Sequence, residues 1–506
     1  MADDDDAVAE LAEAVDVGWI LVCTALVFWE QAGFAMLEAG SVRARNLGNI
    51  LFKNLLDVSL GAVVFAAVGY GLAFGDSASG VVGSTGFFLR SLESPYDYAI
   101  WAWHWSFAAT AATTVSGCVA ERVDCVAYLV AATLVTGVVY AVPVHWVWAD
   151  GGCMSVWHGT TLLEVGVIDF AGSGLVHMVG GLGGLVGSVM LGPRLGRFPA
   201  DAYRRSAAAR LAVAGAREPD AGKGKADDLR GFAGHNATLT ALGVYCLWFG
   251  WFGFNAGCSG GLSGGGAKVA ALAAVNTALA PPGGALVALG LERWRAGYWS
   301  LPATVSGLLA GLVGITGPCG VVAPGAAVVI GAASGAVYAG GRVALDRLCV
   351  DDPVEAIAIH AFPGAWGVVA SGLFARASLV ADAGLEHASA GVLFGGPARQ
   401  LLAQLFGTLA IFAWTCLASA AVFLAGHLAT VQCGNASGLR VTAETELRGL
   451  DATKHGGSAF NFFPAEVVAM LHGVHVDEKS AGLGATELAQ FATHASVPTS
   501  DEESKA

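Results

Sequence analysis

The fold is decided by a stretch that sets an acid and a histidine in an apolar, glycine-rich run, Ile168-Asp-Phe-Ala-Gly-Ser-Gly-Leu-Val-His177-Met-Val-Gly-Gly181. The chain repeats the pair as Asp352-Pro-Val-Glu-Ala-Ile-Ala-Ile-His360, and in both copies a glycine follows the histidine by four residues. Ionisable groups in apolar helices are costly and usually face a bundle interior or a pathway. A single such histidine is more often a packing residue, but two matching copies indicate a function.

The composition is that of a helical membrane protein. Of 506 residues, 55% are hydrophobic and 13% are charged, whereas soluble proteins carry roughly 25% charged residues. The mean hydropathy is +0.61. The net charge of -14 comes partly from the acidic termini and does not indicate nucleic-acid binding. Ten cysteines form no CxxC pattern, so we expect neither a zinc site nor a disulfide framework. We also expect no cofactor.

Apolar length and periodicity predict an all-α polytopic membrane protein with eleven transmembrane helices. The predicted spans lie near 16–39, 49–74, 98–120, 123–148, 168–191, 236–258, 266–291, 298–316, 323–345, 354–374 and 397–427. We therefore expect an acidic N-terminus at 1–15, a transmembrane domain at 16–427 and a tail at 428–506.

The placement of lysine and arginine predicts the orientation. The connections at 40–48, 192–235, 292–297 and 342–353 are basic, and the alternate connections are poor in basic residues. Basic connections stay on the cytoplasmic side. The N-terminus is therefore expected outside, with the tail and the long basic loop at 192–235 in the cytoplasm. Because the first residues are acidic, no cleavable signal peptide is expected.

An odd number of spans leaves two sets of five and one extra helix. Span five enters from outside and span ten from inside, so the two histidines approach the midplane from opposite faces. A histidine eight residues into a helix lies about 12 Å along it, at roughly 1.5 Å per residue. The hydrocarbon core is about 30 Å thick. This geometry predicts an inverted 5+5 repeat with a pathway between its halves.

His177 and His360 are the principal candidate residues. Two imidazoles can share a proton and can hydrogen-bond a small neutral or cationic solute at a narrow point. Zinc binding needs a third ligand, and none stands at suitable spacing. We interpret Asp169 as a helix N-cap that also favours a cation in the outer half of the path. For Asp352 and Glu355, capping and simple loop contacts are both open.

Aromatic residues gather on the predicted outer side. An interfacial belt explains most of them, and a minority would form a cation–π vestibule that strips water from a small cation. The sequence alone does not say which residues belong to the belt and which to the vestibule. The aromatic residues concerned are Trp101, Trp103, Trp105, Phe107, Trp146, Trp148, Trp248, Trp251 and Phe254. No catalytic constellation with plausible spacing indicates an enzyme.

Four segments resemble signatures of the ammonium transporter/Rhesus family. They are Glu30-Gln-Ala-Gly-Phe-Ala-Met-Leu-Glu-Ala-Gly40, Asp169-Phe-Ala-Gly-Ser-Gly-Leu-Val-His177, Trp251-Phe-Gly-Phe-Asn-Ala-Gly257 and the Asp352–His360 segment. The likeness covers roughly 16–460. His104-Trp-Ser-Phe107, the Asp150-Gly-Gly loop and Gly449-Leu-Asp-Ala-Thr-Lys-His-Gly-Gly457 resemble the plant and algal branch of this family.

The resemblance implies an ammonium transporter of the plasma membrane, a homotrimer with one pore per subunit. It implies an outer recruitment site for NH4+, a phenylalanine gate below it, and twin histidines in the pore that conduct NH3 with or without the proton. Methylammonium would serve as an analogue. The implied recruitment residues are Phe107, Trp148, Cys258 and Asp169; the gate is Phe107 with Phe254; the pair is His177 with His360.

The tail resembles the regulatory segment of the family. Thr453 matches a threonine whose phosphorylation closes the three pores, which implies a kinase that acts on the tail. The alternative is an ordinary helix-cap threonine. Two other functions stay open. An ammonium sensor would signal through the tail, where no recognisable signalling domain follows His427. A Rhesus-like electroneutral channel is disfavoured by the intact Trp148, Phe107 and Phe254.

Cys258 departs from the serine that many family members have at this place. A thiol is a weaker hydrogen-bond acceptor than a hydroxyl. We therefore expect Cys258→Ser to keep or improve the apparent affinity for ammonium, measured as the concentration dependence of labelled methylammonium uptake. A large loss of uptake would contradict the placement of Cys258 at the outer site.

Overall fold

The computed structural model describes residues 2–157, 164–199, 202, 204, 232–457 and 459. Every regular element in these ranges is helical, apart from an isolated antiparallel bridge between Val123 and Arg440. The chain divides into a compact unit, Met1–Gly456, and a second unit, Gly457–Ala506. All the structure described below belongs to the first unit.

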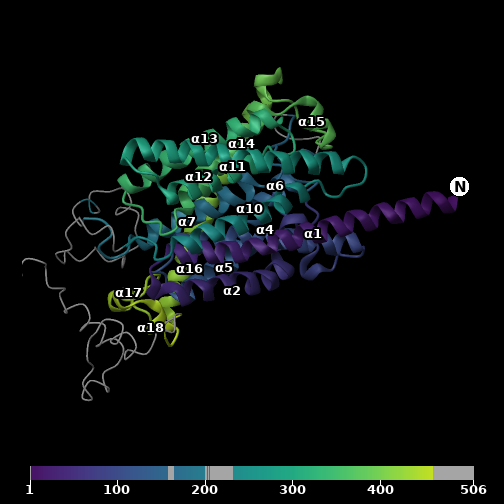
Figure 1. Ribbon diagram of the computed structural model, residues 1–506. Coiled ribbons are helices and arrows are strands. Elements are labelled where there is room, and N and C mark those ends of the chain that lie inside the picture. Colours follow the sequence, from purple (N-terminus) through teal and green to yellow (C-terminus); the bar gives the residue numbers. More distant parts are fainter. Residues whose placement is uncertain are drawn as a thin grey trace, which may run out of the picture. The chain divides into compact units, whose positions relative to one another are not determined.

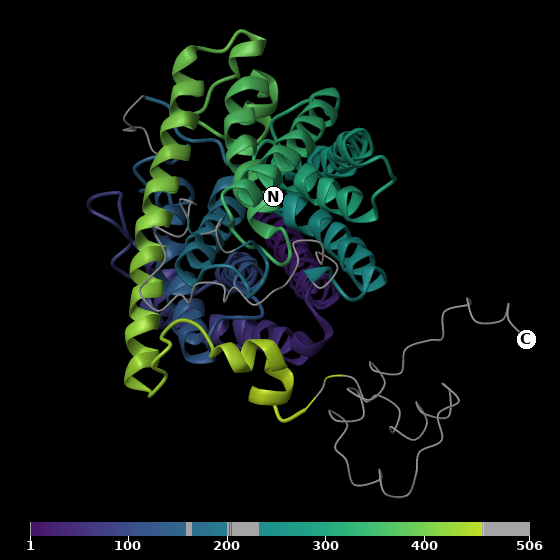
Figure 2. The same ribbon diagram turned by 90° about the vertical axis from the view of Figure 1, so that its left-hand side faces the viewer.

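The long helices lie side by side, and the N-terminal part of α1 extends beyond them (Figure 1). They are α1 (Ala2–Ser41), α2 (Leu47–Val64), α4 (Pro95–Cys118), α7 (Val179–Leu191), α10 (Ala237–Gly257), α11 (Gly266–Ala296), α12 (Leu301–Thr316), α13 (Pro324–Arg347), α14 (Phe362–Phe374) and α16 (Ala398–Gln432). The shorter ones are α3 (Tyr70–Phe74), α5 (Cys125–Leu134), α6 (Ala141–Trp148), α15 (Ala377–Asp382), α17 (Ala443–Arg448) and α18 (Leu450–Lys454). Figure 2 shows α16 along one side of the bundle, where it packs on α5, α7 and α14.

Short π-helical segments interrupt or begin several of these helices. Phe65–Gly69 joins α2 to α3, and Val135–Val139 joins α5 to α6. Ser173–Met178 leads into α7, and Ile357–Ala361 leads into α14. Each of the last two contains one of the paired histidines. Single π turns are rare and occur frequently at functional sites.

The predicted all-α membrane fold is confirmed. Among the described residues, nine helical stretches are long and apolar enough to cross a membrane. α4 and the shorter α12 lie at the other two predicted spans. The count of eleven stays a prediction. At the N-terminus, α1 continues as helix to Ala2, so the acidic segment before residue 16 extends the first span without a break.

The predicted cytoplasmic connections meet at one end of the bundle in a network of buried ion pairs. Arg194 binds Asp351 from its Nε at 2.8 Å and Glu121 from its Nη1 at 3.0 Å, and Arg43 pairs with Glu121 as well. Arg440 binds Glu446 at 2.7 Å and donates to the carbonyl of Leu191 at the end of α7. The N–H of Leu195 donates to Glu446 Oε1 at 2.7 Å, so this network is also tied to the start of the tail.

Asp351 depends on its arginine neighbours. Burial alone would raise the pKa of this carboxyl, but the guanidinium groups of Arg194 and Arg122 and the hydrogen bonds from Arg194 hold it well below its ordinary value. A depressed carboxyl pKa adds stability above its unfolded value of about 3.9 and loses it as the pH falls through the folded value. The network is therefore fully charged and stabilising at neutral pH.

We expect Arg194→Met to destabilise the folded protein by about 3–5 kcal/mol, because it leaves Asp351 and Glu121 buried with an unmatched charge. Thermal unfolding in detergent measures the change. The control is Arg399→Met, which removes an exposed pair with Glu164 and should cost only about 0–1 kcal/mol. Equal melting temperatures for the two variants would contradict a stabilising role of the buried network.

Candidate functional site

Two short acid-led segments place the histidines, and they share one backbone design. The outer lead-in is 169–172, and the inner lead-in is 352–356. Asp169 Oδ2 accepts the N–H groups of Gly174 and Leu175 at 2.9 Å each, and Asp352 Oδ2 accepts the N–H of Ile357 at 2.6 Å. Three residues after each acid the chain turns left-handed, at Gly172 (φ +100°) and Glu355 (φ +59°).

These hydrogen bonds correct the helical position expected from the sequence. The helical turns begin at Ser173 and Ile357, so His177 and His360 lie in the first turns of their segments and not eight residues along a helix. The first N–H groups of a helix have no hydrogen-bond partner within the helix, and a carboxylate can accept hydrogen bonds from them. Both Asp169 and Asp352 act as such caps, so the alternative left open for Asp352 is resolved in favour of capping. Glu355 instead accepts hydrogen bonds from Tyr338 and Ser306.

The two histidine segments approach each other closely through a reciprocal pair of glycines. A Cβ on Gly181 would lie 2.4 Å from the backbone nitrogen of Ala361, the residue after His360. A Cβ on Gly364 would lie 2.8 Å from the backbone nitrogen of Met178, the residue after His177. Neither position has room for a side chain. The glycine that follows each histidine by four residues therefore lets the opposite segment come near.

This approach brings the two histidines into contact. His177 Nδ1 and His360 Nδ1 are 3.2 Å apart, and both rings are buried. One neutral imidazole must donate its Nδ1–H to the Nδ1 lone pair of the other. The donating ring then keeps an Nε2 lone pair, and the accepting ring carries an Nε2–H. Whichever ring donates, the pair offers one acceptor and one donor to a third molecule.

Aromatic rings continue outward from the histidines in a row. Phe254 lies 5.5 Å from His177 between ring centroids and stacks on Phe107 at 4.0 Å. Phe107 meets the edge of Trp148 at 5.9 Å. The row therefore runs Trp148, Phe107, Phe254, His177, His360, and it ends inward at Phe34 of α1, whose ring lies 6.4 Å from His360. We call these six residues the ring row.

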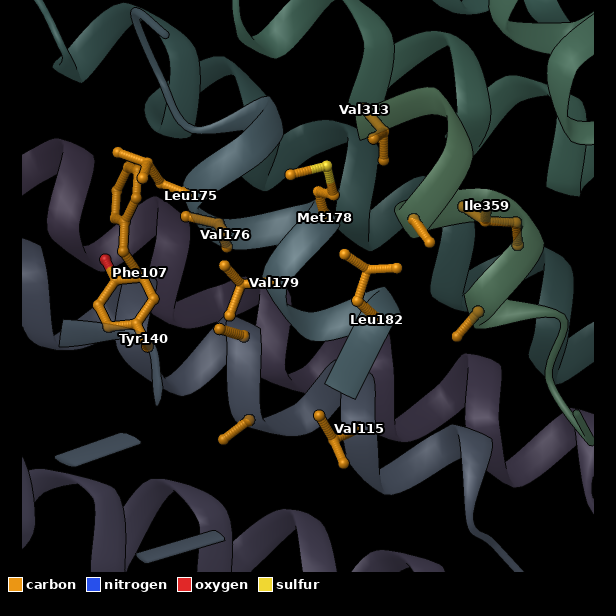
Figure 3. Close-up of a cluster of buried hydrophobic side chains, with 14 of the residues drawn as sticks. Phe107, Val115, Tyr140, Leu175, Val176, Met178, Val179, Leu182, Val313 and Ile359 are labelled. Carbon is orange, nitrogen blue, oxygen red and sulfur yellow. The ribbon is translucent and has the colours of Figure 1, made fainter. Parts of the chain in front are cut away.

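Apolar side chains surround the row. Figure 3 shows Phe107 near Tyr140 at one side and Leu175, Val176, Met178 and Val179 following the histidine segment inward. Val313 of α12 and Ile359, which precedes His360, lie on the opposite side of the view. All of these side chains are buried. A charged solute in this region would have few polar partners, which makes a bare ion costly there.

Asp169 acts on the outer end of the row through its backbone as well as its carboxylate. The indole Nε1 of Trp148 donates to the carbonyl of Asp169 at 2.8 Å, and the Trp148 ring lies against Gly172. The Oδ2 atom of the carboxylate accepts the N–H groups at the start of the histidine segment, while Oδ1 is buried without a described hydrogen-bond partner. One residue thus fixes both the start of the histidine segment and the orientation of Trp148.

Cys258 lies at the C-terminal end of α10, one turn after Phe254, and its thiol donates to the Phe254 carbonyl at 3.3 Å. It is partly exposed.

Sequence reasoning did not single out Trp251 and Phe34 for the site. Trp251 is fully buried, stacks on His177 at 4.9 Å and donates to Thr316, so it does not belong to an interfacial belt. In the sequence it is one of the aromatic residues whose role stays open, and it lies in the Trp251–Gly257 motif. Phe34 likewise lies inside the Glu30–Gly40 motif.

Comparison with known proteins places the chain. A family model described as Ammonium Transporter Family matches residues 18–208 and 204–460. The chain belongs to the ammonium transporter family. Ammonium transporter 1 member 1 of Oryza sativa subsp. japonica is 38% identical over 465 residues, which cover 89% of this transporter and 87% of the relative. Ammonium transporter Amt2 of Archaeoglobus fulgidus is also 38% identical and covers 89% of each chain.

Solved structures agree with this assignment. A protein named Sensor Amt Protein matches with a TM-score of 0.72 and 28% identity, over 88% of this chain and 99% of its own. Mep2 of Saccharomyces cerevisiae matches with a TM-score of 0.67 and 25% identity, over 85% and 88%. The predicted likeness to plant members is confirmed, and the archaeal relative is equally similar. The transporter is therefore a multi-pass membrane protein of a family that moves ammonium and performs no catalysis.

Proposed function

We propose that the ring row is the transport path, with ammonium recruited at its outer end and ammonia conducted past the histidines. The observation that carries this proposal is the unbroken contact from Trp148 through Phe107 and Phe254 to the histidine pair. We assign recruitment to Trp148, Phe107, Cys258 and Asp169. The stacked Phe107 and Phe254 form the gate.

The chemistry of each part suits this assignment. Aromatic faces attract a small cation and can replace part of its water shell. The Phe107–Phe254 stack, at 4.0 Å between centroids, leaves no room for a hydrated ion until one ring moves. Below it, a pair of neutral imidazoles offers one acceptor and one donor. Ammonia has a lone pair and N–H groups, so it can hydrogen-bond to the donor and to the acceptor of the histidine pair. A potassium ion has no proton to leave behind and would have to enter the apolar region charged.

We infer that Asp169 favours the cation without binding it. Its capped carboxylate adds negative charge near Trp148, while its carbonyl holds the indole. We also infer a homotrimer in the plasma membrane, with the N-terminus outside, and with the 192–235 loop and the 428–506 tail in the cytoplasm. Most of that loop and tail lies outside the described residues.

Replacing one histidine tests the path. We expect His177→Ala to reduce labelled methylammonium uptake by at least about 10²-fold, since a positioned proton-transfer group contributes about 10²–10⁴-fold. Uptake and ammonium-evoked current would be measured together in voltage-clamped oocytes. The control is His387→Ala, which changes a loop histidine outside the ring row.

The paired readouts separate the possible functions. Uptake with an inward current means that charge crosses, and uptake without a current means that ammonia alone crosses. If the wild-type protein reaches the cell surface but shows neither uptake nor current, the transport proposal is wrong and a sensor is favoured. One of the structural neighbours is named as a sensor. Normal uptake in His177→Ala would remove the histidine pair from the path.

We propose that the start of the tail regulates the path through α2. Asp451 Oδ2 and Oδ1 accept the N–H groups of Gly48 and Asn49 at 2.9 Å each, at the first turn of α2, and His455 contacts Asn49. Thr453 belongs to the same short helix and donates to the carbonyl of Gly449. A phosphate adds about -1.5 to -2 charge and would repel Asp451 from this docking position.

We expect Thr453→Asp to reduce methylammonium uptake by at least about 10-fold at normal surface expression, because added charge disturbs the Asp451 contact. Thr453→Ala removes the modification site without adding charge and should transport normally. Full activity of Thr453→Asp would rule out the switch and leave Thr453 as an ordinary helix residue.

A further inference from the structure

Four ionisable side chains are buried on the inner side of the ring row, at the junction of α1, α2 and α5. Glu38, Lys53, Asp57 and Tyr128 are each at most 2% exposed. Charges in such surroundings are costly unless they are paired. The transport path described above uses none of these groups.

Lys53 and Asp57 compensate each other. Asp57 accepts the Tyr128 hydroxyl at 2.5 Å on each carboxylate oxygen. Lys53 Nζ donates to the carbonyl of Ser116 at 3.1 Å and lies 4.7 Å from the centre of the Tyr128 ring. One cation and one carboxylate therefore share a tyrosine, and together they carry no net charge.

Glu38 is the surplus acid of this cluster. It interacts electrostatically with Lys53, Asp57 and Asp352, and the amide of Asn54 lies beside it. Its Oε2 is buried and has no hydrogen-bond partner in good geometry within the described ranges. Since Asp57 already balances Lys53, Glu38 can lose or gain a proton without leaving an unmatched cation.

The position of Glu38 connects it to the histidines. On α1 it follows Phe34 by one turn, which is about 6 Å along the axis and on the same helix face. Phe34 is the residue that contacts His360. A Cβ on Gly117 would lie 2.7 Å from Glu38 Oε1 and 2.5 Å from a methyl of Val354 in the inner lead-in. The Glu38 carboxyl and the segment that leads into His360 therefore both face Gly117, one turn further toward the cytoplasmic end.

We propose that Glu38 is the inner proton acceptor of the transporter. This inference rests on the proposed path and adds a residue to it. Ammonium leaves its proton on the histidine pair as it becomes ammonia. The protonated pair then gives H⁺ through intervening water to the Glu38 carboxylate, which leaves neutral imidazoles and a carboxylic acid. Glu38 then releases the proton to cytoplasmic water as hydronium and is a carboxylate again. No atom or electron is gained or lost overall.

The surrounding charges suit a group that alternates between two states. Burial and the negative charges of Asp57 and Asp352 favour the acid, while Lys53 stabilises the carboxylate. The Lys53–Asp57–Tyr128 contacts hold the cation in both states, so little rearrangement accompanies the transfer. The titratable groups that interact with Glu38 are Lys53 and Asp57 from α2, Cys118 from α4, Tyr128 from α5, and Asp352. Arg122, in the turn after α4, interacts with Lys53.

The test compares Glu38→Gln with Glu38→Asp in proteoliposomes that contain the full-length protein. An ammonium concentration jump gives the charge moved, and labelled methylammonium gives the flux of substrate. We expect Glu38→Gln to lower the charge moved per substrate by about 10-fold or more, while the flux of substrate through the apolar pore persists. Glu38→Asp keeps an ionisable group and should retain charge movement.

The outcomes separate this inference from the proposed function. An unchanged ratio of charge to substrate in Glu38→Gln, or a wild type that transports without moving charge, overturns the role of Glu38 alone. A proportional fall of charge and flux also overturns it, since a merely structural residue would have that effect. Absence of methylammonium flux in the wild type overturns the path itself.

Discussion

The structure depends on satisfying backbone N–H groups where two chain segments enter the interior of the membrane-spanning bundle. In a membrane interior, an unpaired N–H or carbonyl has no solvent partner, so non-helical backbone is tolerated only with internal partners. Asp169 and Asp352 supply them at the starts of the two histidine segments. Because each acid is fixed to its own segment, the histidine eight residues later has a defined position. The contact between the imidazoles follows from that position and from the glycines that allow it.

The sequence predicted the elements of this arrangement better than its geometry. Membrane helices follow from composition, and the repeated Asp-His spacing identifies both histidines. The π turns and the left-handed Glu355 were not predictable, because they are local conformations imposed by tertiary packing. Counting from the acid placed each histidine eight residues along a helix, whereas the helical turns begin only four or five residues after the acid. Because each acid accepts a backbone N–H five residues later in the chain, most of the residues between them are not helical, and the helix begins closer to the histidine.

Aromatic residues show the other limit of sequence reasoning. Tryptophan on the outer side suits an interfacial belt and a binding vestibule equally well by composition. Burial places Trp251 and Trp103 inside the bundle, whereas Trp101 and Trp105 are only partly buried. Burial is a property of neighbours that are distant in sequence, such as Thr316, the hydrogen-bond partner of Trp251. The same holds for Glu38, whose environment is built by three other helices.

The cap on α2 has a consequence for how the protein is made. The N–H groups of Gly48 and Asn49 are satisfied by Asp451, a side chain that lies 403 residues beyond Gly48. A ribosome therefore completes α2 long before it supplies the partner for the first turn of that helix. Until then these N–H groups need water or a temporary partner at the membrane surface. The last step in assembling the second helix thus comes near the end of synthesis, and a chain truncated before the tail would never reach it.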